Sequence, residues 1–161
     1  MKLWRIAADT RQYRADDLSG GGAAKRPGRW NDTGEPVIYA ALTISMAVLE
    51  TAAHIDDVGL PLNRYLLEIN VPDDVWGSTE ELDIASLPPA WSAIPAGQAS
   101  VRIGSAWLTT LRSPILLVPS VIVPEESTAL VNPKHPDCKS ITARIVRLFE
   151  YNRLFRSQRM I

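Results

Sequence analysis

The sequence has 161 residues, a length that suits one domain built around one hydrophobic core. Hydrophobic residues make up 46% and charged residues 22%, which is the balance of an ordinary soluble globular protein and excludes a coiled coil or a disordered chain. The 17 basic and 18 acidic residues leave a formal net charge of −1, so no overall field attracts a polyanion and direct binding to DNA is disfavoured. We therefore expect a single domain over residues 1–161 with one functional site.

Few residues are available for disulfides or metal sites. The chain has 1 cysteine and 2 histidines, which excludes an internal disulfide and disfavours a structural zinc site. The first residues turn polar within a few positions, and no stretch approaches the roughly 20 apolar residues that a membrane span needs. We expect a cytoplasmic protein that neither contacts a membrane nor requires a metal.

The first part of the chain predicts short elements separated by loops. Residues 2–7 read as a strand, and the glycine-rich segment 19–31 reads as a flexible basic loop. A brief apolar strand over 37–40 is followed by a helix over 44–55, for which Thr43 is the expected N-cap. The arginines of the basic loop are therefore expected on irregular backbone.

The second part alternates strand, irregular and helical patterns. Residues 63–71 form an expected strand, the proline-rich region from there to 95 is irregular, and 100–110 is compatible with a helix. The apolar runs 115–118 and 121–123 read as two buried strands, interrupted by a proline and a serine.

The segment 140–149 fits both a helical period and strand alternation, so its residues alone leave the assignment open. The 12 prolines are spread along the whole chain, which indicates many short elements rather than one linker between domains. The pattern as a whole predicts a mixed, loop-rich architecture.

Arg29 is the first candidate for chemistry. It follows Gly28, which frees the backbone, and precedes Trp30, which can anchor it. A guanidinium carries a planar set of donors that matches pairs of phosphate oxygens, so an anchored arginine suits a pyrophosphate. The alternative is a surface arginine that merely packs over the tryptophan.

Tyr39 and Glu50 are candidates because of their positions in apolar segments. Tyr39 could present its ring to a flat heterocycle with its hydroxyl free for one hydrogen bond, or it could be a core tyrosine. Glu50 lies inside the apolar run 46–53, where a buried carboxylate needs a partner or a task, although an exposed position is equally compatible. At helical spacing His54 shares a face with Glu50, so it could pack on the helix or support the carboxylate.

Three candidates lie later in the chain. Ser120 follows a proline between two apolar runs, where its hydroxyl could point from a kink or simply satisfy its own turn. Asn132 and His135 belong to a loop bracketed by prolines, which could hold an amide and a histidine for binding or be a structural turn. Several arginines near the carboxyl end are expected on a solvated or partner-facing edge; they are Arg144, Arg147, Arg153, Arg156 and Arg159.

Read together, these pieces resemble the RES domain, a family named for its arginine, glutamate and serine. The segments that carry the resemblance are LWRI at 3–6, GRWN at 28–31, IYAA at 38–41, AVLE at 47–50, YLLEINVP at 65–72, GSAWL at 104–108, VPSV at 118–121, PEE at 124–126 and NPKHP at 132–136. The similarity spans nearly the whole chain. It departs from the family pattern in the short, proline-rich segment 86–95, which bears on the rim of the site.

The resemblance implies an α+β fold similar to that of ADP-ribosyltransferase toxins, in which twisted sheets with flanking helices frame a cleft for NAD. It also favours a strand over 140–149. Members of the family are toxins of toxin–antitoxin pairs that cleave the nicotinamide-ribose bond of NAD by hydrolysis or phosphorolysis, with NAD as the substrate and no resident cofactor. The implied partner is a helix-turn-helix, Xre-like antitoxin through which DNA is contacted indirectly, and a homodimer within the larger complex is expected.

The resemblance maps the family's named arginine, glutamate and serine onto Arg29, Glu50 and Ser120, with Tyr39, Asn132 and His135 as further positions, and the roles that we assign to them are a hypothesis. The expected catalytic residues are Arg29 for the pyrophosphate, Tyr39 for the nicotinamide or its ribose, Glu50 for the cationic ribose and Ser120 for orienting the substrate. The expected substrate-binding residues are Trp30, Asn31, Asn132 and His135. Two other functions are kept: a mono-ADP-ribosyltransferase acting on a cellular protein, and a non-catalytic module that binds nucleic acid or a protein partner.

Overall fold

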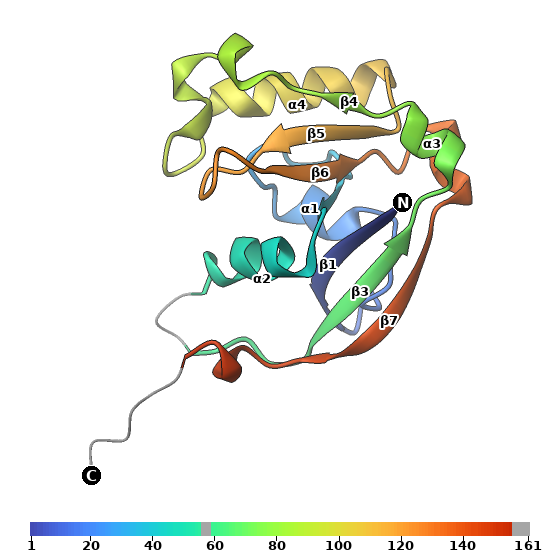
Figure 1. Cartoon of the computed structure of the whole chain (residues 1–161), viewed down its shortest axis with the longest axis vertical. Helices are drawn as coiled ribbons and strands as arrows, with labels where there is room; N and C mark the ends of the chain where they lie inside the picture. The colour runs from blue at the N-terminus through green and yellow to red at the C-terminus, as the bar shows by residue number, and fades with distance from the viewer. Residues whose placement is uncertain (56–58, 156–161) are drawn as a thin grey trace.

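Seven strands form one mixed sheet in the computed structural model, which describes residues 1–55 and 59–155 (Figure 1). The helices and strands are β1 (Lys2–Ala8), α1 (Gly21–Lys25), β2 (Ile38–Ala41), α2 (Ile44–Ala52), β3 (Arg64–Asn70), α3 (Asp73–Gly77), β4 (Glu80–Glu81), α4 (Gln98–Thr110), β5 (Ile115–Pro119), β6 (Ser127–Val131) and β7 (Thr142–Phe149). Short 3₁₀ turns occupy parts of the connections, among them Pro89–Ser92 and Pro136–Ser140.

The sheet consists of two halves that meet at a narrow joint. The strand order is β4-β5-β6-β2-β1-β3-β7, with β4 parallel to β5 and the other neighbours antiparallel. A single residue pair, Trp4 with Ala41, joins β1 to β2, whereas β1 pairs with β3 along its whole length. We call β4, β5, β6 and β2 the β5 half, and β1, β3 and β7 the β1 half. Figure 1 shows the strands of the two halves running in different directions.

Side-chain alternation divides the core between the two faces of the sheet. One cluster combines strands of both halves, including Leu3, Ile69 and Val131. On the other face, α4 covers the β5 half through the fully buried Trp107. On that same face α2 packs on the β1 half, where Met46 and Ala47 meet Ile6, Ala41 and Leu66. The helix that carries Glu50 is therefore anchored on β1 and β3 and lies beside the end of β2.

Most of the expected elements are confirmed, and so is the α+β architecture with flanking helices. The observed bounds of β1, β2 and β3 each lie within one residue of the expected ones. Helix α2 begins after Thr43, whose hydroxyl accepts a hydrogen bond from the backbone N–H of Met46 at 3.1 Å, and it ends at residue 52. The segment 142–149, which the residues alone left open, is strand β7.

Three expectations were wrong in detail. The proline-rich region up to residue 95, expected to be irregular, contains the short helix α3 and the two-residue strand β4. Residues 121–123 do not form a strand, because the chain turns there. The strand that follows β5 and pairs with it in the antiparallel direction is β6, at 127–131, which the sequence did not predict. The expected loop 19–31 contains the short helix α1. Apolar residues at 121–123 suggested burial, yet Ile122 is 41% exposed, and this loop bends back towards the end of β5.

The described residues contain neither a candidate membrane span nor a candidate metal cluster. No helix within residues 1–55 and 59–155 is long and apolar enough to cross a membrane. Within the same residues, no group of three or more histidine, cysteine, aspartate and glutamate side chains is placed to hold a metal ion.

Candidate functional site

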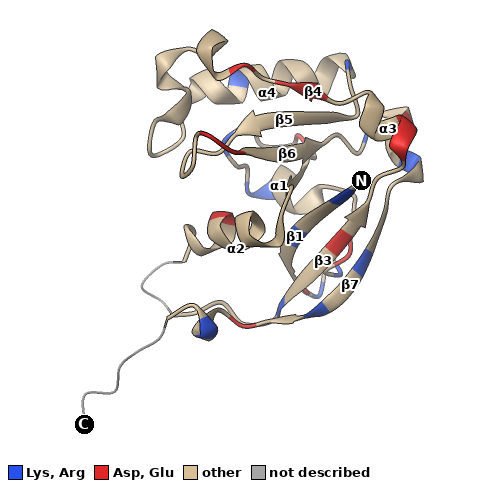
Figure 2. Ribbon diagram, in the orientation of Figure 1, with Lys and Arg blue, Asp and Glu red and all other residues tan. Residues whose placement is uncertain are grey.

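Helix α2 carries a lone carboxylate next to the sheet. Its sequence, ISMAVLETA, contains no other charged residue, so the red segment on α2 in Figure 2 is Glu50. Met46 and Ala47 are buried against the sheet, and Glu50 follows them by one helical turn and is half-buried. The helix thus directs one negative charge to the margin of the core rather than into open solvent.

Ser120 reaches this carboxylate from the end of β5. The serine is 2% exposed, and its Oγ donates a hydrogen bond to Glu50 Oε1 at 2.6 Å. The same oxygen accepts hydrogen bonds from the backbone N–H groups of Ile122 and Val123, both at 3.1 Å. Because an N–H group can only donate, the one hydroxyl hydrogen is directed to Glu50. Two side chains 70 residues apart are therefore joined in a fixed orientation.

Arg29 lies in the electrostatic range of the same carboxylate. Its Nη1 donates to the backbone carbonyl oxygens of Trp91 at 2.9 Å and Ala93 at 2.8 Å. Burial lowers the pKa of the guanidinium, while the negative charge of Glu50 opposes that shift. The structure thus brings Arg29, Glu50 and Ser120 to one region.

The hydroxyl of Tyr39 is not free, contrary to the expectation from the sequence. It donates to Asn31 Oδ1 at 2.7 Å and accepts from the backbone N–H of Trp30 at 3.0 Å. Burial raises the pKa of this phenol far above its usual range. Gly28 lies directly against the ring, since a Cβ atom there would approach the Tyr39 Cζ to 2.7 Å. Tyr39 therefore fixes the loop that carries Arg29, and its ring is covered on the side of Gly28.

Trp30 and Asn31 support this loop from the inside, so the structure does not favour their expected contact with substrate. They are 3% and 1% exposed. Asn31 Oδ1 also accepts from the backbone N–H of Gly28 at 2.8 Å, and its Nδ2 donates to the carbonyls of Ala23 and Glu35, each at 2.9 Å. The ring of Trp30 stacks on a second tryptophan, Trp91. Their polar and aromatic groups are committed to holding residues 28–31.

Asn132 and His135 lie at the opposite end of β6 from the Ser120 turn. The buried Asn132 donates from Nδ2 to the carbonyl of Leu108 at 3.0 Å and accepts from the backbone N–H of Lys134 at 3.1 Å. His135 Nδ1 accepts from the backbone N–H of Asp137 at 3.2 Å and caps a 3₁₀ turn. Both residues shape a turn, which is the structural alternative to binding that the sequence left open.

His54 does not support the carboxylate either. Helix α2 ends at Ala52, and His54 is exposed in the turn that follows. The face that Ala47 and Glu50 share along the helix therefore does not extend to the histidine.

Comparisons with known proteins identify the family of this chain. The family described as the RES domain matches residues 2–152. The chain belongs to the RES domain family. A relative named Prs ADP-ribosylating toxin, from Sphingobium sp. (strain YBL2), is 54% identical over 150 residues, which are 93% of each chain. A protein named Toxin Res from Pseudomonas putida is 36% identical over 96% of this chain and 100% of its own.

The fold of this RES domain is shared with a solved structure, the M. tuberculosis MbcT-MbcA toxin–antitoxin complex. The TM-score is 0.63 at 18% sequence identity, and the match covers 91% of this chain and 84% of the solved one. At this identity the likeness concerns the fold.

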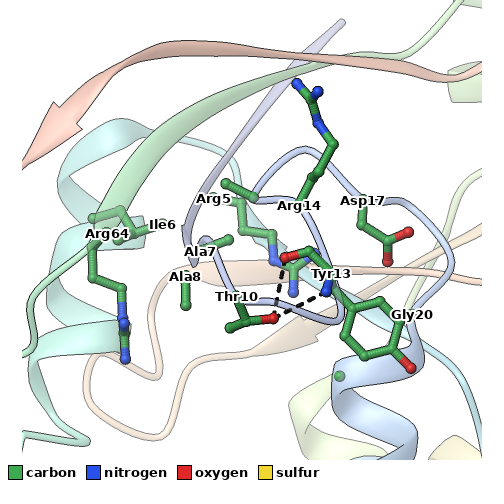
Figure 3. Close-up of a pocket in the computed structure, with 12 residues that line it drawn as sticks. Arg5, Ile6, Ala7, Ala8, Thr10, Tyr13, Arg14, Asp17, Gly20 and Arg64 are labelled. Carbon is green, nitrogen blue, oxygen red and sulfur yellow. Dashed lines mark hydrogen bonds between the residues drawn. The ribbon is translucent and has the colours of Figure 1, made fainter.

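A pocket that the sequence reasoning missed lies beside β1 and the residues that follow it. Its volume is about 270 Å³, and it is lined by Arg5, Thr10, Tyr13 and Asp17, among others (Figure 3). Burial lowers the pKa of the Arg5 guanidinium, and Asp17 opposes that shift. The side chain of Arg5 makes no hydrogen bond or ion pair with another residue of the part of the chain that the structure describes. The signal in the sequence was an arginine within the apolar run that follows Lys2 in the first strand.

The pocket and Glu50 lie on different sides of β1. Trp4 and Ile6 face α2, so the alternation of the strand directs Arg5 away from that helix. In Figure 3 the side chains of Arg14 and Arg64 point away from one another, and Arg14 pairs with Asp16 at 3.0 Å. Arg5, Arg14 and Arg64 all line this hollow, a setting that suits an anionic group.

Proposed function

We propose that this RES domain is a toxin that transfers ADP-ribose from NAD to a cellular protein. The observation that carries the proposal is the hydrogen bond between Ser120 and Glu50, with Arg29 within electrostatic reach of that carboxylate but not paired to it. A carboxylate that is oriented by a neutral donor and flanked by a guanidinium provides the two charges that a dinucleotide with a cationic ribose intermediate requires.

In the proposed reaction, the bond between ribose C1′ and the nicotinamide nitrogen breaks, and its electron pair returns to the ring, which leaves as neutral nicotinamide. The positive charge that develops on the ribose is stabilised by the Glu50 carboxylate. A nucleophilic atom of the acceptor then forms a bond to C1′ and loses a proton to solvent or to Glu50. Arg29 holds the pyrophosphate, and Ser120 keeps one carboxylate oxygen in place so that the other can face the substrate.

Tyr39 has a different role in this proposal from the one expected from the sequence. Its hydroxyl is committed to residues 30 and 31. We therefore assign it to positioning the Arg29 loop, with Trp30 and Asn31 in the same supporting role. Its ring is half-buried, and we propose that nicotinamide stacks on the part that the core leaves uncovered.

The name of one relative bears on the acceptor, the group that receives ADP-ribose. From the sequence, cleavage of NAD by water or phosphate was the first expectation. The relative that is 54% identical is instead named as a toxin that ADP-ribosylates Prs. We propose the same type of acceptor for this chain, a protein and specifically Prs. Water and phosphate are then slower competing acceptors that would still consume NAD.

We also propose that an antitoxin binds this chain, because the MbcT toxin with the same fold is found in a complex with its antitoxin MbcA. A helix-turn-helix antitoxin, contact with DNA only through it, and a homodimeric toxin remain predictions. Co-expression with the protein encoded next to it, followed by size-exclusion chromatography, would test for the complex.

The experiment uses NAD labelled on its adenylate part, incubated with the pure chain and either cell lysate or purified Prs. A labelled band at the mass of Prs is expected, whereas free ADP-ribose or ADP-ribose 1″-phosphate without a labelled protein would assign the chain to NAD degradation. Glu50→Gln keeps an acceptor for Ser120 and should lower the rate on the order of 10²–10³. The exposed Glu150→Gln is the matched control and should leave the rate unchanged. Full activity of Glu50→Gln would overturn the assigned role.

A further inference from the structure

We infer that the segment 88–95, anchored by Trp91, positions Arg29 for the reaction and holds it apart from Glu50. The inference rests on the proposed function, because it assigns to Arg29 a substrate contact. The segment lies within the proline-rich stretch 86–95 in which the sequence departs from the family pattern, and its role comes from the contacts that its backbone makes.

The hydrogen bonds of Arg29 occupy the donors on one nitrogen of its guanidinium and leave the other donors without a partner among the described residues. A guanidinium has five N–H donors, two of them on Nη1. The Nη1 atom contacts two carbonyls, those of Trp91 at 2.9 Å and Ala93 at 2.8 Å, which is its full capacity. The edge formed by Nε and Nη2 makes no hydrogen bond to a described residue and can bind two oxygens of one phosphate.

The two carbonyls are fixed by the same aromatic pair that fixes the Arg29 backbone. Trp91 is 7% exposed, and its ring stacks on that of Trp30 with centroids 6.2 Å apart and an interplanar angle of 24°. Trp30 follows Arg29 in the chain, so the stack ties the backbone of Arg29 to the segment that receives its side chain. The segment starts with Pro88 and Pro89, which restrict its backbone further.

This arrangement also keeps the two charges of the site apart. Opposite charges in a half-buried setting attract each other, and the charge of Glu50 partly offsets the lowering of the Arg29 pKa by burial. Nevertheless, no ion pair within 4.0 Å joins Arg29 to Glu50 or any other described carboxylate. A direct Arg29–Glu50 pair would occupy both groups. The carbonyls of 91 and 93 hold the guanidinium where each group stays available to the substrate.

The test compares Trp91→Ala with Trp91→Phe. Removal of the ring should release the two carbonyls, raise KM for NAD and lower kcat, with kcat/KM falling roughly 10- to 100-fold, because small misplacements of a binding group have effects of this size. Phenylalanine can still stack on Trp30 and should keep kcat/KM within about threefold of wild type. In an Arg29→Ala background, Trp91→Ala should cause no further loss, since its effect passes through Arg29.

A matched control separates positioning from loss of stability. Trp76 is a partly buried tryptophan of α3 that packs on the opposite core cluster, so Trp76→Ala should lower the Tm without changing kcat/KM well below it. A second readout needs no activity: the Nε–H resonance of Arg29, assigned by its loss in Arg29→Lys, should shift in Trp91→Ala and stay in place in Trp76→Ala.

Each outcome tests either the positioning role of the segment 88–95 or the proposed function. Equal kcat/KM for Trp91→Ala and wild type, or a multiplicative loss in the Arg29→Ala background, would overturn the positioning role. An unshifted Arg29 resonance in Trp91→Ala would do the same. If wild type consumes no NAD and labels no protein, the proposed function fails, whereas the resonance shift still tests the contact itself.

Discussion

Replacement of Ser120 by alanine tests the contact on which the site depends. The change removes the one hydrogen bond that orients Glu50, formed at 2.6 Å. A hydrogen bond to a charged group contributes about 1.5–3 kcal/mol, and if all of it is felt in the transition state the rate falls about 10-fold to about 160-fold. The loss should appear mainly in kcat, because the serine acts on the carboxylate that stabilises the developing charge.

The fold should tolerate this change. The backbone N–H groups of Ile122 and Val123 lose their acceptor, but Ile122 is 41% exposed, so water can replace the hydroxyl. Release of labelled nicotinamide measures the rate, and circular dichroism checks the fold. Ser140→Ala is the control, since that exposed hydroxyl bonds only the nearby carbonyl of Asp137. A folded Ser120→Ala protein with a rate within about twofold of wild type would refute the argument that the serine orients Glu50.

Three further predictions concern stability and reactivity. In Gly104→Ala the new Cβ would lie 1.7 Å from the carbonyl oxygen of Trp30, so α4 must shift. The free energy of unfolding, measured with urea, should therefore fall by about 1–3 kcal/mol. An unchanged free energy of unfolding would contradict this close approach. The Arg144 guanidinium lowers the pKa of Glu68, so this pair stabilises the fold above the ordinary glutamate pKa of about 4.3. The stabilisation is lost as the pH falls from there through the lowered pKa of Glu68. The free energy of unfolding of Glu68→Gln should therefore depend less on pH between neutral and acid than that of wild type. Burial raises the pKa of the Cys138 thiol to about 11, so the folded protein should react with iodoacetamide at pH 8 about a hundredfold more slowly than the unfolded one, and equal rates would contradict this burial.

The elements that the sequence predicted well have a local cause. Thr43 and the apolar spacing behind it specify the start of α2, and alternation specifies β3. The error at 121–123 has a long-range cause, because nothing nearby indicates that the backbone N–H groups of this run would bind Ser120 Oγ rather than pair in the sheet. Strand β6, with the sequence STALV, starts with two polar residues and becomes apolar only where it is buried, so its pattern is weak.

The charged and polar residues of the candidate site were predictable from the sequence, whereas the contacts that position them were not. Arg29, Glu50 and Ser120 were chosen from the sequence, and the structure brings them to one region. The sequence could not indicate that the hydroxyl of Tyr39 would be used by residues 30 and 31, or that Trp91 would supply a carbonyl to Arg29. These contacts join segments distant in the chain, and spacing along a sequence contains no information about which backbone carbonyl a side chain will reach.

The narrow joint between the two halves of the sheet has a mechanical consequence. Glu50 moves with α2 and hence with β1 and β3, whereas Ser120 and Arg29 belong to the other half. Among the described residues, the pair of Trp4 and Ala41 is the only one that joins strand β1 of one half to strand β2 of the other. The side chains packed under α2 therefore largely set the angle at which the two halves meet. A bulkier residue at position 41 would open that angle and pull the carboxylate away from its serine without touching either one.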